Sequence, residues 1–334
     1  MHWLVTGGAG FVGSNVALAL VERGDSVVVV DDLSRRGSEL NQVILRERAG
    51  VEVLIVDITD YSAMCAVFKT HGPFDAVAHL AGQVSLVASI ENPARDFEVN
   101  ALGTVNILEC VRLLSVDAAV IGMSSNKAYG DLGSVRIVEH EDRYEAPDYP
   151  DGFDESLPLD FHGPYGCSKG TADQYLVDYH RTFGLRTFSL RHSSVYGPMQ
   201  HPRSDQGWVG FLIGEAVAGR TIQLNGHGKQ VRDLLHASDL AALIMLLGDL
   251  PTEKAGHALN VGGGPERSLS ILQLFEWYEA KTGNEVAYRT GERRLSDQEV
   301  FISCNHKVES LTGWTPTVSL DEGLGELLRQ SQAR

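Results

Sequence analysis

The sequence predicts an α/β fold: a doubly wound parallel sheet with a smaller C-terminal lobe. The first observation is length, because 334 residues exceed the roughly 100–200 that usually make one domain. The second is that short β-branched apolar runs alternate with amphipathic stretches through the first half of the chain. The third is that this rhythm is lost in the second half, which glycine and proline interrupt.

The predicted strands and helices follow one another in a regular order. The apolar runs lie at residues 3–6, 26–30, 52–56, 76–79 and 118–123, with helical patterns between them at 12–23, 61–70 and 96–114. A further helix at 168–182 and a strand at 187–191 continue the series. Continuously apolar runs that are each followed by a helix indicate a parallel sheet covered on both faces. In such a sheet, ligands bind beyond the carboxyl ends of the strands.

The composition is that of an ordinary soluble globular protein and argues against several other classes. Lys plus Arg number 28 and Asp plus Glu number 44, so the formal net charge is −16, which disfavours a broad basic surface for nucleic acid or anionic lipid. No apolar run approaches the roughly 20 residues that span a bilayer, and the first strand leaves no room for a signal peptide. Four scattered cysteines and histidines without metal-ligand spacing predict neither a disulfide framework nor a bound metal. We expect a reduced cytoplasmic protein.

Residues 130–164 interrupt the alternation of strands and helices. The segment carries four prolines, many acidic groups and four aromatic side chains, Tyr144, Tyr149, Phe153 and Phe161. A loop of this length inside a compact domain is usually either functional or disordered. The aromatic side chains favour an ordered lid near the site over a disordered segment.

A glycine-rich turn follows the first strand directly. Residues 6–13 read Thr-Gly-Gly-Ala-Gly-Phe-Val-Gly, in which Gly7, Gly10 and Gly13 recur at every third position before a helix. Glycines let the backbone turn tightly and approach a pyrophosphate, whose charge the helix N-terminus then stabilises. Because the turn lies between a strand and a helix, it predicts a Rossmann-type dinucleotide site.

The residues at the following strand ends favour NAD as that dinucleotide. Asp31 lies 18 residues beyond Gly13, where its carboxylate would accept hydrogen bonds from an adenosine ribose and repel a 2′-phosphate. The neighbouring Arg35 and Arg36 leave NADP open as the alternative. Asp57 and Ile58 are placed to reach an adenine edge, whereas His79 is more readily explained as a packed strand-end histidine. The remaining cofactor contacts that we expect lie in the turn and at strand ends: Phe11, Val12, Asp32, Ser34, Arg35, Leu80, Ala81, Gly82, Ser124, His192 and Val195.

Tyr165 and Lys169 lie four residues apart, which places a phenol and an amine on one face of a helix. Free tyrosine titrates near 10 and is a poor base at neutral pH. A cation about 4 Å away, at an effective dielectric near 20, contributes about 4 kcal/mol, enough to bring the phenol pKa towards neutrality. A phenolate beside a nicotinamide can take a hydroxyl proton while hydride leaves the same carbon. The Tyr-x-x-x-Lys spacing is common by accident, but together with the glycine turn, Asp31 and the pair Ser124 and Ser125 it predicts a catalytic site.

This combination resembles the extended short-chain dehydrogenase/reductase family of NAD-dependent nucleotide-sugar epimerases and dehydratases, over essentially the whole chain. The resemblance implies that Ser125 hydrogen-bonds the reacting sugar oxygen and that Tyr165 acts as base and acid. It implies that Lys169 lowers the phenol pKa and holds the nicotinamide ribose. Asn100 matches the helix asparagine of the family as a cofactor contact, with backbone support as the alternative.

The expected domain division follows from the same resemblance. Residues 1–190, with about 234–262, would form the NAD-binding Rossmann domain. Residues about 191–233 and 263–334 would form the nucleotide-sugar-binding lobe.

Residues 124–130 distinguish the branches of the family. Dehydratases resemble one another in a Ser-Thr-Asp-Glu segment before Tyr-Gly, whose acidic pair helps to expel water. This chain has Asn126 and Lys127 there, which cannot reproduce that pair, so dehydration is disfavoured. The segment is instead similar to the epimerases that act at C2 of a CDP-linked hexose, as are residues 131, 154–156, 159–170, 191–197, 205–210, 228–233 and 296–298. One departure is Cys304, where such chains usually carry an acid, and we expect it to remove only a helix cap.

The resemblance implies NAD-dependent epimerisation at C2 of a CDP-hexose through a transient ketone, with return of the same hydride and no net redox change. Arg232 is the candidate for the pyrophosphate, with a surface ion pair to Asp233 as the alternative. The other expected substrate contacts are Gln83, Ser125, Asn126, His162, Gln206, Gly207, Trp208, Asp297 and Gln298.

Several other functions remain possible on the sequence alone. They are a C4 epimerase of a UDP- or GDP-sugar, a nucleotide-sugar 4,6-dehydratase, an oxidoreductase of the same fold and a non-catalytic NAD-sensing protein. The resemblance also suggests a homodimer or homotetramer packed through helices.

Overall fold

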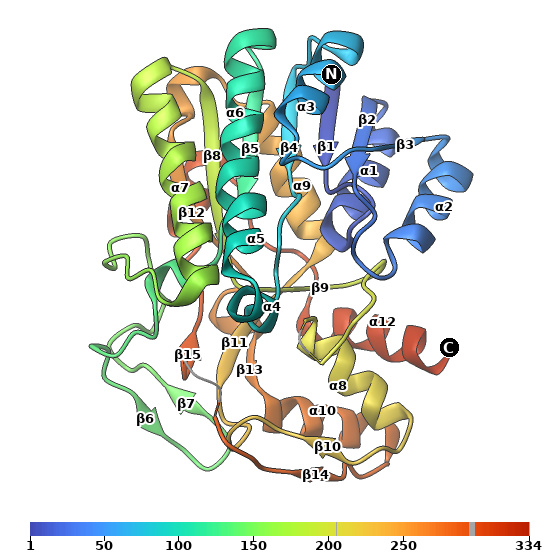
Figure 1. Cartoon of the computed structure of the whole chain (residues 1–334). Helices are drawn as coiled ribbons and strands as arrows, with labels where there is room; N and C mark the ends of the chain where they lie inside the picture. Colours follow the sequence, from blue (N-terminus) through green and yellow to red (C-terminus); the bar gives the residue numbers. More distant parts are fainter. Residues whose placement is uncertain (205, 294–297, 334) are drawn as a thin grey trace.

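The protein is built on a seven-stranded sheet with the strand order β12-β8-β5-β4-β1-β2-β3 (Figure 1). The computed structural model describes residues 1–204, 206–293 and 298–333. Every pairing in this sheet is parallel. The chain reverses direction across the sheet between β1 and β4, which is the position where doubly wound folds bind ligands. The strands are β1 (His2–Thr6), β2 (Ser26–Asp31), β3 (Val53–Ile55), β4 (Ala76–His79), β5 (Ala119–Met123), β8 (Arg186–His192) and β12 (His257–Val261).

Helices cover both faces of this sheet, and β1 shows how. Trp3 and Val5 belong to one core cluster, whereas Leu4 belongs to another, because successive side chains of a strand point to opposite faces. The first cluster includes residues of α1 (Phe11–Arg23), α2 (Ser38–Ala49) and α9 (Ala237–Gly248). The second includes residues of α3 (Tyr61–His71), α6 (Gly103–Leu114) and α7 (Gly163–Phe183). The predicted doubly wound parallel fold is therefore confirmed.

The largest local difference from the expected elements precedes α6. The sequence pattern predicts one helix over 96–114, but the chain forms α4 (Leu86–Glu91), α5 (Pro93–Phe97) and a π-helical turn η1 (Glu98–Leu102) before α6. The Asn92 side chain caps α5 by accepting from the Arg95 amide at 3.1 Å. A π turn adds one residue to a single helical turn, a local irregularity that a search for a regular helical period does not detect.

The C-terminal lobe lies beyond the carboxyl ends of the sheet (Figure 1). Its own sheet joins β13 (Ser268–Ser270), β11 (Val231–His236) and β15 (Val300–Phe301), and β9 (Ser194–Tyr196) pairs with β11. A second pair is β10 (Ile222–Gln223) with β14 (Tyr288–Arg289). The helices of the lobe are α8 (Trp208–Val217), α10 (Ile271–Thr282), α11 (His306–Thr312) and α12 (Leu320–Gln332). Short 3-10 turns complete the chain at η2 (Asn126–Tyr129), η3 (Thr252–Lys254) and η4 (Pro265–Arg267).

The chain passes between the two parts more than once. After β11 in the lobe it returns through α9, which packs against α1, and through β12, which pairs with β8. The domain division expected from the sequence assumes this interleaving, and its boundaries stay a prediction. Among the described residues, no helix is both long and apolar enough to cross a membrane.

Residues 130–164 are ordered and pack against the lobe. They include the short hairpin of β6 (Val138–Glu139) and β7 (Tyr144–Glu145). The ring centroid of Phe153 lies 4.8 Å from that of Tyr149 and 5.6 Å from that of Phe301 in β15. Tyr144, Tyr149 and Phe153 of this segment therefore contribute to a core cluster.

Candidate active site

The glycine turn after β1 leaves the start of α1 without a side-chain cap. Gly7 has a φ of +65°, and the Gly10 amide donates to the Gly7 carbonyl at 3.0 Å. A Cβ on Gly13 would lie 2.1 Å from the Gly7 oxygen, so only glycine fits there. Gly10 is the N-cap of α1, and no side chain of the described residues accepts from the first turn. These backbone amides are therefore available to bind an anion.

Asp31 ties this turn to the end of β2. Its carboxylate accepts from the Ala9 amide at 3.0 Å and from the Leu33 amide at 2.8 Å. The residue is buried, and desolvation raises the pKa of its carboxyl. The Asp31 carboxylate therefore holds the glycine turn in place. Its remaining lone pairs could accept the hydrogen bonds that are predicted from the adenosine ribose.

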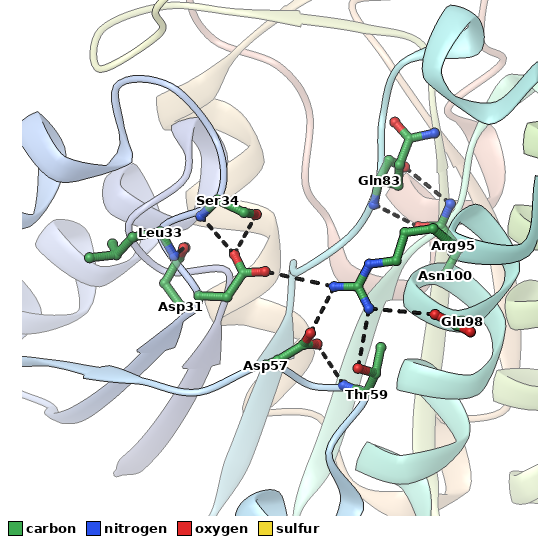
Figure 2. A network of polar contacts seen from close by, with 10 residues as sticks. Asp31, Leu33, Ser34, Asp57, Thr59, Gln83, Arg95, Glu98 and Asn100 are labelled. Atoms are coloured by element: carbon green, nitrogen blue, oxygen red, sulfur yellow. Dashed lines mark hydrogen bonds and ion pairs between the residues drawn. The ribbon is translucent and has the colours of Figure 1, made fainter. Parts of the chain in front are cut away.

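At the outer end of this groove, Asp57 binds an arginine that sequence reasoning missed. Figure 2 shows the Arg95 guanidinium reaching towards Asp57 and Thr59, with Asp31 on the far side. The ion pair between Arg95 and Asp57 measures 2.7 Å. The nearest sequence signal is the Asn-Pro pair at 92–93, which marks a helix start, but it carries no information about Asp57.

Asn100 and Gln83 are joined by a pair of hydrogen bonds (Figure 2), and Asn100 also contacts Ser168 of α7. The Asn100 side chain accepts from the Gln83 amide at 2.9 Å and donates to the Gln83 carbonyl at 3.1 Å and to Ser168 at 3.1 Å. Asp96 accepts from Ser168 at 2.5 Å and from the Gln83 side chain at 2.7 Å. The interpretation of Asn100 as backbone support agrees with these contacts. The Gln83 side chain binds Asp96 and the Ser85 carbonyl and is not among the residues that line the cavity, and its role as a sugar contact stays a prediction.

Ser125, Tyr165 and Lys169 converge on one cavity, as the resemblance implies. Ser125 precedes η2 and accepts from the Lys127 amide at 3.2 Å, which fixes its hydroxyl. Tyr165 and Lys169 share a face of α7 and are 7% and 5% exposed. The Lys169 ammonium donates to the Met123 carbonyl at the end of β5 at 3.0 Å.

The expected lowering of the Tyr165 pKa by Lys169 does not hold for the groups of this chain alone. Burial raises the pKa of Tyr165 to about 12, and the contact with the Ser125 hydroxyl only partly opposes this effect. Burial also lowers the pKa of Lys169 to about 8, against the attraction of the Asp96 carboxylate. The Coulomb argument made from the sequence did not include the cost of removing the phenol and the ammonium from water.

The cavity has a volume of about 410 Å³ and runs from the dinucleotide groove into the lobe. Expected cofactor contacts that line it are Phe11, Val12, Leu80, His192 and Val195. Expected substrate contacts that line it are Asn126, Gln206, Trp208 and Arg232. Other residues that line the cavity were not expected from the sequence. They come from α4, the chain after β9, α8, and β10 with the turn after it: Leu86, Gln200, Phe211, Leu212, Gln223, Leu224 and Asn225.

Several expected residues lie elsewhere. His162 is exposed at the start of α7, outside the cavity lining. Gln298 is fully buried, its side-chain amide pairs with the Asn126 side chain at 2.8 Å and with the Gly130 carbonyl at 2.7 Å, and its role as a nucleotide contact stays a prediction. Gly207 is the N-cap of α8. Asp297 lies outside the described residues.

The lid expected from 130–164 is not found, since none of its described residues lines the cavity. Three of the four aromatic side chains that suggested a lid, Tyr144, Tyr149 and Phe153, belong to the hydrophobic cluster beside β15 instead.

Two further expectations are answered by hydrogen bonds. Asp233 faces away from Arg232 and accepts from the Gly264 and Ser303 amides at 3.1 Å, so the alternative ion pair does not form. His79 is a packed histidine between Thr6 and Thr104, at 2.8 and 3.0 Å, and burial lowers its pKa to about 3. The N-cap of α11 is Asn305, whose side chain does not cap the helix, so the loss of a cap at Cys304 stays a prediction.

The fold and the site together define a dinucleotide-dependent enzyme of the short-chain dehydrogenase type. The model of the NAD dependent epimerase/dehydratase family matches residues 3–262, and the chain belongs to that family. CDP-paratose 2-epimerase from Salmonella typhi is 41% identical over 332 residues, 98% of each chain. This was the nearer resemblance implied by residues 124–130.

Two solved structures extend the comparison. UDP-glucose 4-epimerase from Thermotoga maritima, solved with UDP-glucose, superposes with a TM-score of 0.82 at 30% identity over 98% of each chain. UDP-glucose 4-epimerase from Thermus thermophilus, solved with NAD, gives a TM-score of 0.82 at 28% identity over 99% of each chain. NAD is the cofactor of this family, and the residues present fit it: the start of α1 is uncapped, and the buried Ser124 hydroxyl has no partner among the described residues.

Proposed function

We propose that this chain is an NAD-dependent epimerase that inverts C2 of a CDP-linked hexose of the CDP-paratose or CDP-tyvelose type. The observation that carries the proposal is the 41% identity to CDP-paratose 2-epimerase over 98% of both chains. Asn126 and Lys127 stand where dehydratases of the family carry an acidic pair. The catalytic groups Ser125, Tyr165 and Lys169 share a cavity with Asn126 and Lys127.

The proposed chemistry assigns a separate task to each buried group. Tyr165 takes the proton of the C2 hydroxyl and returns it after inversion, while Ser125 holds the reacting oxygen by a hydrogen bond. When bound, NAD supplies the hydride acceptor and donor, and its positive ring favours the phenolate. Lys169 adds positive charge on the same face of α7 as the phenol. Its hydrogen bond to the Met123 carbonyl keeps the ammonium group in place.

The lobe supplies the grip on the nucleotide. The Arg232 guanidinium donates to the Val231 carbonyl at 2.7 Å and to the Gln298 carbonyl at 2.8 Å, which fixes it at the cavity wall. A fixed guanidinium fork suits two phosphate oxygens. Trp208, held by a bond from its indole N–H to Ser194 at 3.0 Å, offers a flat apolar surface beside it. This arrangement supports firm binding of the nucleotide. The proposed mechanism requires weaker binding of the sugar, because the ketone intermediate must rotate before the hydride returns.

The test is a panel of CDP-, UDP-, GDP- and dTDP-hexoses incubated with the NAD-loaded protein in heavy water and read by NMR. We expect inversion at C2 of the CDP-hexose, without deuterium at that carbon and without net NADH. Deuterium at C2 would show proton abstraction instead of internal hydride transfer and would overturn the mechanism. Inversion at C4 of a UDP- or GDP-hexose alone would replace the proposed substrate with the 4-epimerase alternative.

We also propose that the protein forms a homodimer or homotetramer that packs through α6 and α7. We propose further that it resides in a reducing compartment such as the cytoplasm. Large apolar side chains are exposed on these two helices, among them Leu113 at 54% and Phe183 at 48%. All four cysteines are free thiols, which supports the reducing compartment. Light scattering of the wild-type protein and of Leu113→Glu tests the assembly, since a charge in the interface would yield the monomer.

A further inference from the structure

Arg95 bridges segments that are far apart in the sequence. It projects from α5 and places one guanidinium nitrogen 2.7 Å from Asp57, which follows β3. The other nitrogen donates to the Thr59 hydroxyl at 3.3 Å. Figure 2 shows this guanidinium lying across the gap between the strand ends and the helices that carry Asn100.

Two further carboxylates complete the charge cluster. Asp32, which follows β2, lies 4.0 Å from the guanidinium, and Glu98 in the π turn lies 3.7 Å away. Burial opposes ionisation of Asp57, but hydrogen bonds from Thr59 and Arg95 outweigh it and lower its pKa. The hydrogen bond to Asp57 raises the pKa of Arg95. Both groups therefore stay charged at neutral pH.

The position of this cluster matters because of the residues it connects. Asp32 follows the buried Asp31 that braces the glycine turn, and Asp57 precedes Ile58 at the expected adenine edge. A bound adenosine would lie between these strand ends and α5. The Arg95 side chain is 38% exposed, so it can leave and re-form its contacts without unfolding the core.

We propose that Arg95 is a positioning residue that closes the adenosine end of the NAD site and strengthens binding of the cofactor there. The inference rests on the proposed function, in which the same hydride returns to the substrate and NAD need not leave between turnovers. It also accounts for a partly exposed arginine whose partners among the described residues follow β2 and β3 or lie in the π turn.

The test measures each half of the cofactor separately by calorimetry. ADP-ribose probes the adenosine end, and nicotinamide mononucleotide probes the end at Tyr165. Arg95→Met keeps the apolar stem and removes the charge, and we expect it to weaken ADP-ribose binding about tenfold, as for loss of one charge-assisted hydrogen bond. Binding of the mononucleotide should change less than about twofold. Arg95→Lys, which keeps the charge but not the fork, should recover part of the loss.

The matched control is Arg220→Met, which removes an arginine paired with Glu215 at 2.6 Å on the lobe surface. It should bind both probes as the wild type does. Unchanged ADP-ribose affinity in Arg95→Met would overturn the proposal, and so would an equal loss for both probes, which would mean a general structural defect. If the wild type binds neither probe, the proposed NAD-dependent function itself fails, which is a different result.

Discussion

The two ends of the predicted NAD site differ in how far their charged and titratable groups are exposed to water. At the nicotinamide end, Tyr165 and Lys169 are 7% and 5% exposed, and burial moves both pKa values. At the adenosine end, the Arg95 and Asp57 side chains are 38% and 36% exposed and are held by ion pairs. In the proposed function, proton transfer therefore depends on the buried groups Tyr165 and Lys169. Binding of the cofactor at the adenosine end depends instead on the ion pair of Arg95 and Asp57, which is partly exposed to water. Changes at one end should therefore leave the other largely unaffected.

The largest effect should come from Tyr165→Phe. The substitution removes the hydroxyl that exchanges the proton but keeps the buried ring, so turnover should fall by about a hundredfold or more. NAD affinity should remain within about twofold of the wild type, because the phenol oxygen lies at the reacting end. Steady-state kinetics and NAD titration check both parts. Near-normal turnover would remove Tyr165 from its proposed role.

Lys169→Met tests the burial itself, through stability. The pKa of Lys169 falls from 10.5 to about 8 on folding, so between these values the unfolded chain binds more protons. The penalty of the buried charge is therefore complete below about pH 8 and disappears as pH rises towards 10.5. After allowance for the lost bond to Met123, the variant should be more stable than the wild type by about 2 kcal/mol at neutral pH, although inactive.

Thermal unfolding of both proteins across this pH range measures the prediction. The advantage of Lys169→Met should shrink as the pH increases above 8. A variant that is no more stable than the wild type at pH 7 would show that the ammonium is well solvated or paired, and the contrast between the two ends would be lost.

The elements that could be predicted from the sequence are those whose signal is local. The turn from β1 to α1 reads directly from an apolar strand followed by Gly7, Gly10 and Gly13. Tyr165 and Lys169 are one helical turn apart, so their spacing alone places them together. For the same reason, the parallel order of the strands followed from the alternation of apolar runs with helices.

The unpredicted parts depend on contacts that no local pattern records. Gln298 reaches Asn126 across 172 positions, and Arg95 reaches Asp57 across 38. The lobe end of the cavity is lined by residues of α8 and of the turn after β10, which contact one another in the folded lobe but share no local sequence pattern. The pKa of Tyr165 in the chain alone could not be predicted for another reason: charge spacing can be read from a sequence, but desolvation needs the packed structure.

Asp31→Asn should weaken NAD binding about tenfold, as for loss of one hydrogen bond to a charged group. The carboxylate accepts from two backbone amides, Ala9 and Leu33, whereas the carboxamide has one acceptor oxygen and turns an NH2 group towards the other amide. The glycine turn would lose its brace on one side. Titration with NAD checks the prediction, and Asp148→Asn, at an exposed ion pair with Arg136, is the control. Equal affinity in Asp31→Asn and the control would show that the brace contributes nothing to binding.

The smallest expected effect is a difference in salt dependence at the adenosine end. Raising the ionic strength from about 0.05 M to about 0.5 M shortens the screening length from more than 10 Å to less than 8 Å. Because the Arg95 cluster is about one-third exposed, its ion pairs should weaken, whereas the buried contacts of Lys169 should not. ADP-ribose carries its own charge, so the informative quantity is the difference between proteins. We expect salt to weaken ADP-ribose binding about twofold more in the wild type than in Arg95→Met. Identical salt dependence in the two proteins would mean that the guanidinium acts only by filling space, and that charge does not distinguish the two ends of the site.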